Sequence, residues 1–156
     1  MHNCTRTILF LLCLIAGEQL FAQDTTVTWL NNIDTSAFTI SYDKKRIPEE
    51  LYPAIGIKSL RDIANPGKRY RRGCVGGARL PNKRLNWMAS DKNNHWILSV
   101  SYGGYACGTK FYFIDKDSGQ LNTNIMYFTC REPGKLTLGK LIPELNAKRF
   151  IRGTVQ

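Results

Sequence analysis

The sequence predicts a single small α+β domain, an antiparallel β-sheet of about five to seven strands with one or two short helices. Several short runs alternate apolar with polar residues, which is the period of a strand buried on one face. Between these runs lie Gly, Asn, Asp and Ser, the residues that form turns. The chain of 156 residues is 43% hydrophobic and 22% charged, values typical of one globular domain.

Residues 1–22 have the pattern of a cleaved secretory signal peptide. Arg6 provides a positive start, and an unbroken apolar run follows from Ile8 to Ala16, with cleavage predicted after Ala22. The apolar run is shorter than the roughly 20 residues that span a bilayer. We therefore expect one extracytoplasmic domain over residues 23–156, periplasmic or extracellular, without a transmembrane segment.

In the first part of this domain, the sequence predicts two strands and two short helices. The segments 25–31 and 37–42 alternate apolar residues with polar ones and form a first pair of strands. A helix is predicted to start at Pro48, because proline loses nothing at a first helical position. A second helix is predicted after Ser59, a residue type that caps helix N-termini.

The centre of the domain predicts a meander of four strands. A strand over residues 84–90 places Leu85, Trp87 and Ala89 on one face, and residues 91–94 form a turn into the next strand. Strands over 96–102, 109–114 and 121–130 follow. In the first of these, every second residue is apolar or aromatic and lies on one face: Trp96, Leu98, Val100 and Tyr102. In the second, Phe111 and Phe113 lie on one face.

The turn over residues 116–119 predicts a register in which Asp115 opposes Gln120. After it, Thr137 is predicted to cap a short helix that carries Leu138, Leu141, Ile142 and Leu145. Pro143 either interrupts that helix or starts a second piece of it.

Three cysteines remain after the leader: Cys74, Cys107 and Cys130. In an oxidising compartment they predict one disulfide and one spare thiol. We favour Cys107 with Cys130, across the predicted hairpin, and Cys74 with Cys107 is the main rival. No metal site and no cofactor are predicted, because His95 is the only histidine in the mature chain and no CxxC spacing occurs.

The segment 68–84 is strongly basic and contains no acidic residue. Its cationic residues are Lys68, Arg69, Arg71, Arg72, Arg79, Lys83 and Arg84. Glycines and Pro81 within it predict a loop. One interpretation is a solvated face whose charges pair with scattered carboxylates. The other is an anion-binding loop, in which arginines and glycine amides contact a phosphate, sulfate or carboxylate.

A second unusual loop, residues 102–108, is rich in glycine and tyrosine. Tyr102 and Tyr105 would form a rigid contact surface for a partner. In the alternative interpretation the glycines fit a turn or bulge, and the tyrosines cover the edge of the sheet.

The net charge of +10 favours encounters with anionic partners. We therefore predict a non-enzymatic, exported binding or inhibitor-like protein whose partner is an anionic ligand or an acidic protein surface, and for which nucleic acid is not the expected ligand. No catalytic residue is predicted. The alternative is a small hydrolase acting on envelope glycan or peptide, with a fold-assembled carboxylate or His95 as its base.

Overall fold

The computed structural model describes residues 33–73, 79–104, 108–129, 136–146 and 151–154. Residues 34–156 form one compact unit. The predicted signal peptide and the predicted strand over residues 25–31 lie outside the described residues, and both stay predictions.

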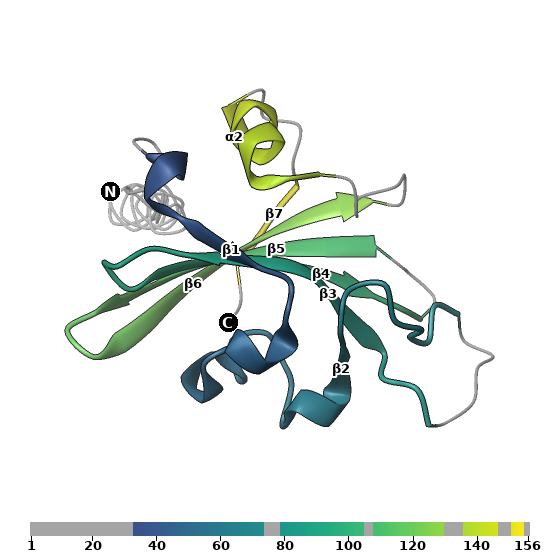
Figure 1. Ribbon diagram of the computed structural model, residues 1–156. Helices are drawn as coiled ribbons and strands as arrows, with labels where there is room; N and C mark the ends of the chain where they lie inside the picture. Colours follow the sequence, from purple (N-terminus) through teal and green to yellow (C-terminus); the bar gives the residue numbers. More distant parts are fainter. Residues whose placement is uncertain (1–32, 74–78, 105–107, 130–135, 147–150, 155–156) are drawn as a thin grey trace, which may run out of the picture. The chain divides into compact units, whose positions relative to one another are not determined.

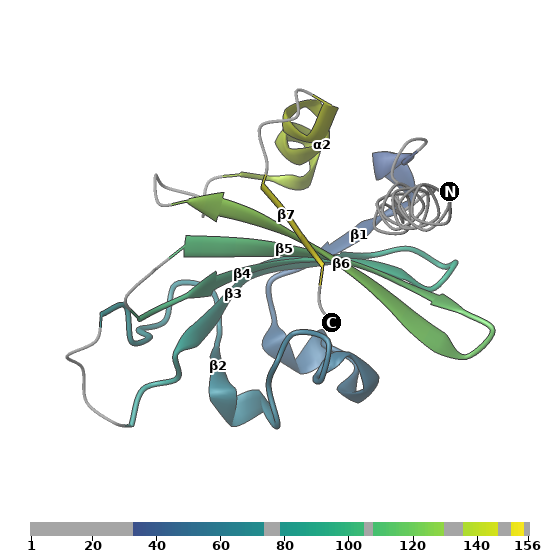
Figure 2. The same ribbon diagram turned by 180° about the vertical axis from the view of Figure 1, so that it is seen from behind.

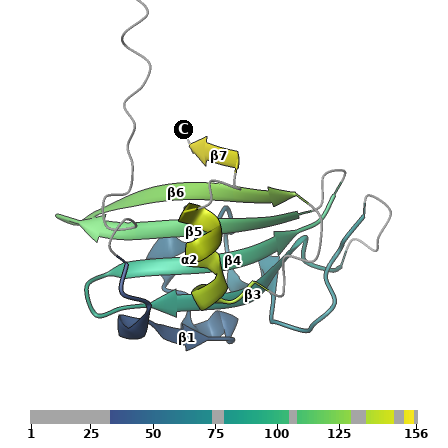
Figure 3. The same cartoon turned by 90° about the horizontal axis from the view of Figure 1, so that it is seen from above.

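One β-sheet organises the unit (Figure 1). Its strands are β1 (Thr39–Ser41), β2 (Ile63–Ala64), β3 (Lys83–Ser90), β4 (His95–Tyr102), β5 (Gly108–Asp117), β6 (Gln120–Thr129) and β7 (Ile151–Thr154). Figure 3 shows the order β1-β3-β4-β5-β6-β7, in which all neighbours are antiparallel. The two-residue β2 pairs in parallel with the start of β3. The predicted antiparallel sheet is confirmed.

The hairpin of β5 and β6 is confirmed, but its predicted register is wrong by two residues. Asp117 opposes Gln120, whereas the prediction set Asp115 there. The turn is shorter than the predicted four residues, because Ser118 and Gly119 alone close it with positive φ angles of 49° and 86°. Two-residue hairpin turns with positive φ at both positions match the twist of the strands.

One face of the sheet is covered by short helical turns that precede β3 in the chain (Figure 1). They are the 3-10 turns η3 (Lys44–Arg46), η4 (Glu49–Leu51) and η5 (Leu60–Asp62). Leu51, Ile55 and Ile63 are fully buried against sheet residues such as Leu98 and Ile114. This cluster is the main hydrophobic core.

Two predicted helices are single 3-10 turns in the structure. Ser59 is the predicted N-cap: its side chain accepts a hydrogen bond from the backbone N–H of Arg61, and with Asp62 it forms a capping box. The turn nevertheless stops at Asp62, because Ile63 is extended and joins the sheet as β2.

The other face carries α2 (Leu138–Asn146), the helix predicted after Thr137, seen on the opposite side of the sheet from η3–η5 in Figures 1 and 2. The predicted break at Pro143 is wrong, because this proline lies inside one continuous helix. Leu138 and Leu141 are buried, as are Phe111 and Phe113 of β5. The indole N–H of Trp87 donates to the carbonyl of Leu136 at 2.8 Å, which ties the approach to α2 to strand β3.

A β-bulge in β3 corrects the predicted face of one residue. Leu85 opposes Val100 and Trp87 opposes Ser99, so Asn86 is an extra residue between them. Leu85 therefore belongs to the main core, and Trp87 packs with Phe111 on the other face, at 6.0 Å between ring centroids. The prediction that Leu85 and Trp87 share a face is wrong.

Two further differences concern the ends of the unit. The strand predicted over residues 37–42 is shorter, because η2 (Thr35–Ala37) occupies its start and β1 spans Thr39–Ser41. The tail holds an unpredicted strand, β7, which pairs with β6.

Candidate loop-end anion site

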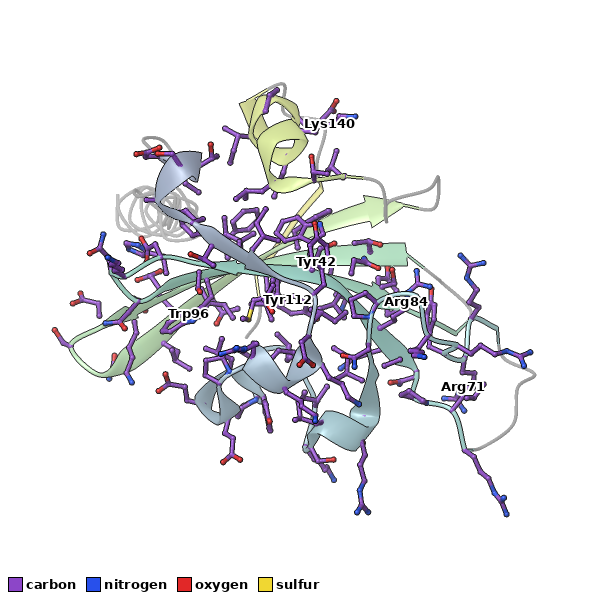
Figure 4. The ribbon with its side chains drawn as sticks, viewed as in Figure 1. Tyr42, Arg71, Arg84, Trp96, Tyr112 and Lys140 are labelled. Atoms are coloured by element: carbon purple, nitrogen blue, oxygen red, sulfur yellow. The ribbon has the colours of Figure 1, made fainter. Side chains whose placement is uncertain are left out.

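The two unusual segments of the sequence meet at one end of the sheet. Lys83 opposes Tyr102, and Tyr102 opposes Gly108, so the start of β3, the end of β4 and the start of β5 lie together. We call this the loop end, and we call the opposite end, with the turns at residues 91–94 and 118–119, the turn end. Figure 4 shows Arg71 and Arg84 toward the loop end and Trp96 toward the turn end.

Backbone contacts hold the basic segment against the glycine-tyrosine loop. Gly103 donates its N–H to the carbonyl of Asn82 at 2.9 Å, and Gly104 donates to that of Arg72 at 3.2 Å. A Cβ atom built on Gly103 would lie 1.6 Å from the carbonyl oxygen of Arg71. Glycine at 103 is therefore required by close approach of the two backbones.

Two open grooves are lined by residues of the basic segment, and a third adjoins one of them. The Tyr70 groove is lined by Gly67, Lys68, Arg69, Tyr70, Arg72 and Arg84. The Arg71 groove is lined mainly by Lys58, Arg61, Asp62, Arg71, Arg79 and Pro81. The Tyr52 groove is lined mainly by Glu49, Tyr52, Pro53, Lys58, Leu60 and Arg61. The last two grooves adjoin, since Lys58 and Arg61 line both.

In the Tyr70 groove, an aromatic ring positions two guanidinium groups. The guanidinium carbon of Arg84 lies 4.7 Å from the centre of the Tyr70 ring, and that of Arg72 lies 6.0 Å from it. Cation–π contacts of this kind fix a guanidinium without neutralising it. The Nε atom of Arg84 is buried and has no hydrogen-bond partner among the described residues. Arg84 is therefore held in place with donor capacity to spare.

The Arg71 groove carries four cations and one carboxylate. Asp62 accepts hydrogen bonds from the backbone N–H groups of Lys58 at 2.8 Å and Ser59 at 2.9 Å. These two bonds, that from Lys58 first, lower the pKa of Asp62 below its ordinary value. Within the described ranges, Arg61, Arg71 and Arg79 form no ion pair with a carboxylate. The positive charge of this groove is therefore only partly offset.

Lys83, one of the predicted site residues, binds backbone carbonyl groups of the protein itself. The ammonium of Lys83 donates to the carbonyl of Ile55 at 2.9 Å and to that of Gly56. Burial lowers the pKa of Lys83, the charge on Lys110 lowers it further, and Asp62 acts in the opposite direction. This lysine therefore ties β3 to the turn after η4, and its ammonium is used within the fold.

The structure brings the remaining predicted residues together only in part. Lys68, Arg69, Arg72 and Arg84 share one groove, whereas Arg71 and Arg79 line another. Tyr102 is half-buried and lies 5.2 Å from the Nζ atom of Lys110, measured to its ring centre. Tyr105 and the three mature cysteines, Cys74, Cys107 and Cys130, lie outside the described residues.

Three residues at this end were missed by sequence reasoning. Tyr70 stands inside the basic run, and an aromatic residue interleaved with arginines was a usable signal for it. Lys58 and Arg61 are separated from the run in sequence. Only the fold brings them beside Arg71, so no local pattern could have found them.

His95, the base of the hydrolase alternative, lies at the turn end. Its Nδ1 atom is 2.7 Å from Oδ2 of Asp91, whose other oxygen accepts from the backbone N–H groups of Asn93 and His95. Burial raises the pKa of Asp91, but these hydrogen bonds outweigh burial and leave the pKa below its ordinary value. The pair closes the turn between β3 and β4.

Two further kinds of feature are absent from the described residues. No group of three or more His, Cys, Asp or Glu side chains there is arranged to hold a metal ion. None of the helices in the described ranges combines the length and apolar character needed to cross a bilayer.

Comparisons with known proteins give no relative from which a function could be transferred. No protein-family model, no curated protein and no solved structure matches the chain. We therefore infer the function from this chain's own residues.

Proposed function

We propose that this protein is an exported, non-enzymatic binding or inhibitor-like protein that binds an anionic ligand or an acidic protein surface at its loop end. The signal-like leader, residues 1–22, supports export. The concentration of cations at one end of the sheet supports the binding role.

The observation that carries the proposal is the composition of the three grooves. Eight cationic side chains line them against two carboxylates, Glu49 and Asp62. The cations are Lys58, Arg61, Lys68, Arg69, Arg71, Arg72, Arg79 and Arg84. Clustering of one charge sign on a surface attracts ligands of the other sign, and arginine forks match carboxylate, sulfate and phosphate oxygens.

Backbone hydrogen bonds near Arg71 hold this part of the basic segment in place before a ligand binds. Arg71 donates its N–H to the carbonyl of Pro81 at 2.9 Å, so the basic segment closes on itself before it meets Gly103. Arginine side chains carried on backbone that is already held in place lose less conformational entropy when a ligand binds.

The test is a titration of the exported protein with heparin, polyphosphate, nucleic acid and anionic lipid vesicles at two salt concentrations. Contacts through arginine should weaken steeply as salt screens them. A triple variant, R61A/R71A/R79A, should bind the preferred anion at least about tenfold more weakly at low salt.

The matched control removes the same number of charges elsewhere. Lys45, Arg46 and Lys92 are exposed and do not line the grooves, so K45A/R46A/K92A should keep nearly full affinity. If both triple variants lost the same anion affinity, net charge and not the grooves would account for binding. Binding that ignores salt and survives R61A/R71A/R79A would contradict the proposal.

A further inference from the structure

The Tyr52 groove differs in chemistry from its neighbour. Tyr52 and Leu60 pack one side against the main core and line the groove, and Pro53 is exposed beside them. The groove thus offers an apolar surface, and Glu49 also lines it. Lys58 and Arg61 form the boundary with the Arg71 groove.

A ligand that crosses this boundary meets two surfaces. On one side it meets the cations of the Arg71 groove, and on the other it meets Tyr52 and Pro53. A sugar ring has an apolar face of C–H groups, which packs on an aromatic or proline surface, and an edge of hydroxyl donors. Glu49 is an acceptor when ionised, so it can accept from those hydroxyls.

From this arrangement we propose that the anionic ligand is an acidic polysaccharide. Its sulfate or carboxylate group binds Lys58, Arg61 and Arg71, and the adjoining sugar ring packs on Tyr52 and Pro53. This inference rests on the proposed anion-binding function and specifies its ligand.

The open form of the groove favours a saccharide over an acyl lipid. An acyl chain needs an enclosed apolar cavity to leave water, whereas this groove is open to solvent and carries Glu49. A plain polyanion such as polyphosphate also fits poorly at Glu49, because it offers no apolar face and is repelled by the carboxylate. The Arg71 groove alone accommodates it.

The experiment compares three probes of similar charge: a heparin oligosaccharide, an oligogalacturonate and a polyphosphate. Tyr52→Ala should weaken binding of at least one of the saccharides about five- to tenfold and leave polyphosphate binding unchanged. Tyr52→Phe keeps the ring and should keep saccharide affinity. Tyr42→Ala is the matched control, because Tyr42 is 61% exposed and lies outside the grooves.

A measurement on the unaltered protein covers the case in which Tyr52→Ala unfolds. Nuclear magnetic resonance signals of the Tyr52 ring should shift with a saccharide and stay in place with polyphosphate. Equal responses of the ring to saccharide and polyphosphate, or equal weakening of both by Tyr52→Ala, would overturn the inference while the anion site stands. Failure of all three probes to bind would instead overturn the anion-binding function itself.

Discussion

The two ends of the sheet use charged side chains differently. At the turn end, Asp91 binds His95 and the backbone of its own turn, and Lys116 forms an ion pair of 2.6 Å with Glu50. At the loop end, Arg61, Arg71 and Arg79 line an open groove and form no ion pair with a carboxylate in the described part of the chain. Lys83 differs from these loop-end arginines, because its ammonium donates to backbone carbonyl groups of the fold.

This difference separates charge that holds the fold together from charge that is available to a ligand. Short turns leave little freedom, and a carboxylate that accepts backbone N–H groups stabilises them. The long segment before β3 is held by backbone contacts, so most of its side chains are not needed to close it. The comparison predicts large stability effects from closure residues and small ones from groove arginines.

The largest expected effect concerns covalent closure of the loop end. Gly108 opposes Thr129, and the next residue on each strand is Cys107 and Cys130, both outside the described residues. The register of the described pair Gly108 and Thr129 supports the predicted bridge over its rival. We predict this bridge, and C107S/C130S should lose about 3 kcal/mol of unfolding free energy.

Peptide mapping under non-reducing conditions checks the pairing, and urea unfolding checks its stability effect. Cys74→Ser is the control and should keep both the bridge and the stability. A mapped peptide pair that contains Cys74 would favour the rival pairing and contradict the argument from register.

Gly103 comes next, because it marks the closest approach at the loop end. In Gly103→Ala the new Cβ meets the Arg71 carbonyl, and relief requires backbone movement. We expect a loss of about 1–3 kcal/mol of unfolding free energy, measured in urea. Gly73→Ala is the matched control, because nothing described lies within 4 Å of its added Cβ. Similar losses in the two variants would refute the close-approach argument.

Lys83 tests whether a loop-end cation can serve the fold alone. Lys83→Met removes the donor from two carbonyls, and unfolding free energy should fall by about 1–2 kcal/mol. Affinity for the anionic ligand should change little. Lys92→Met, at an exposed site in the turn between β3 and β4, should leave stability nearly unchanged. Loss of anion binding in Lys83→Met without loss of stability would move Lys83 back into the ligand surface.

The sequence was most informative where local rules decide the structure. Alternation over Trp96, Leu98 and Val100 correctly assigned the core face of β4, because that strand pairs with β5 in a regular register. Its other face is buried as well, which alternation with polar residues does not predict. The same rule failed at Trp87, because the bulge at Asn86 shifts the pleat by one residue.

The candidate site was only partly visible in sequence for a related reason. The run around Arg71 is dense enough to recognise, and Tyr70 lies inside it. Lys58 and Arg61 come to the same groove because Lys83 ties the preceding turn to β3 and because β2, directly after η5, pairs with β3. Long-range packing of this kind leaves no spacing that a sequence pattern can report.

The turn end gives a prediction on pH. Since the pKa of Asp91 is lowered in the folded chain, its carboxylate stabilises the fold above the unfolded value of about 4. That stabilisation is lost as the pH falls through the lowered pKa. Asp91→Asn should cost about 1 kcal/mol at pH 7 and less at pH 2, measured by urea unfolding at both. An equal cost at the two pH values would contradict the role of the charge.

The smallest expected stability effect belongs to the groove arginines. R61A/R71A/R79A removes three like charges that form no ion pair with a carboxylate among the described residues, so it relieves repulsion and breaks little packing. Unfolding free energy should stay within about 0.5 kcal/mol of that of the unaltered protein, or rise slightly. The same variant is the one expected to lose anion affinity, so stability and binding should separate. A loss of about 2 kcal/mol or more would show that these arginines hold the basic segment in place, and the contrast between the two ends would then fail.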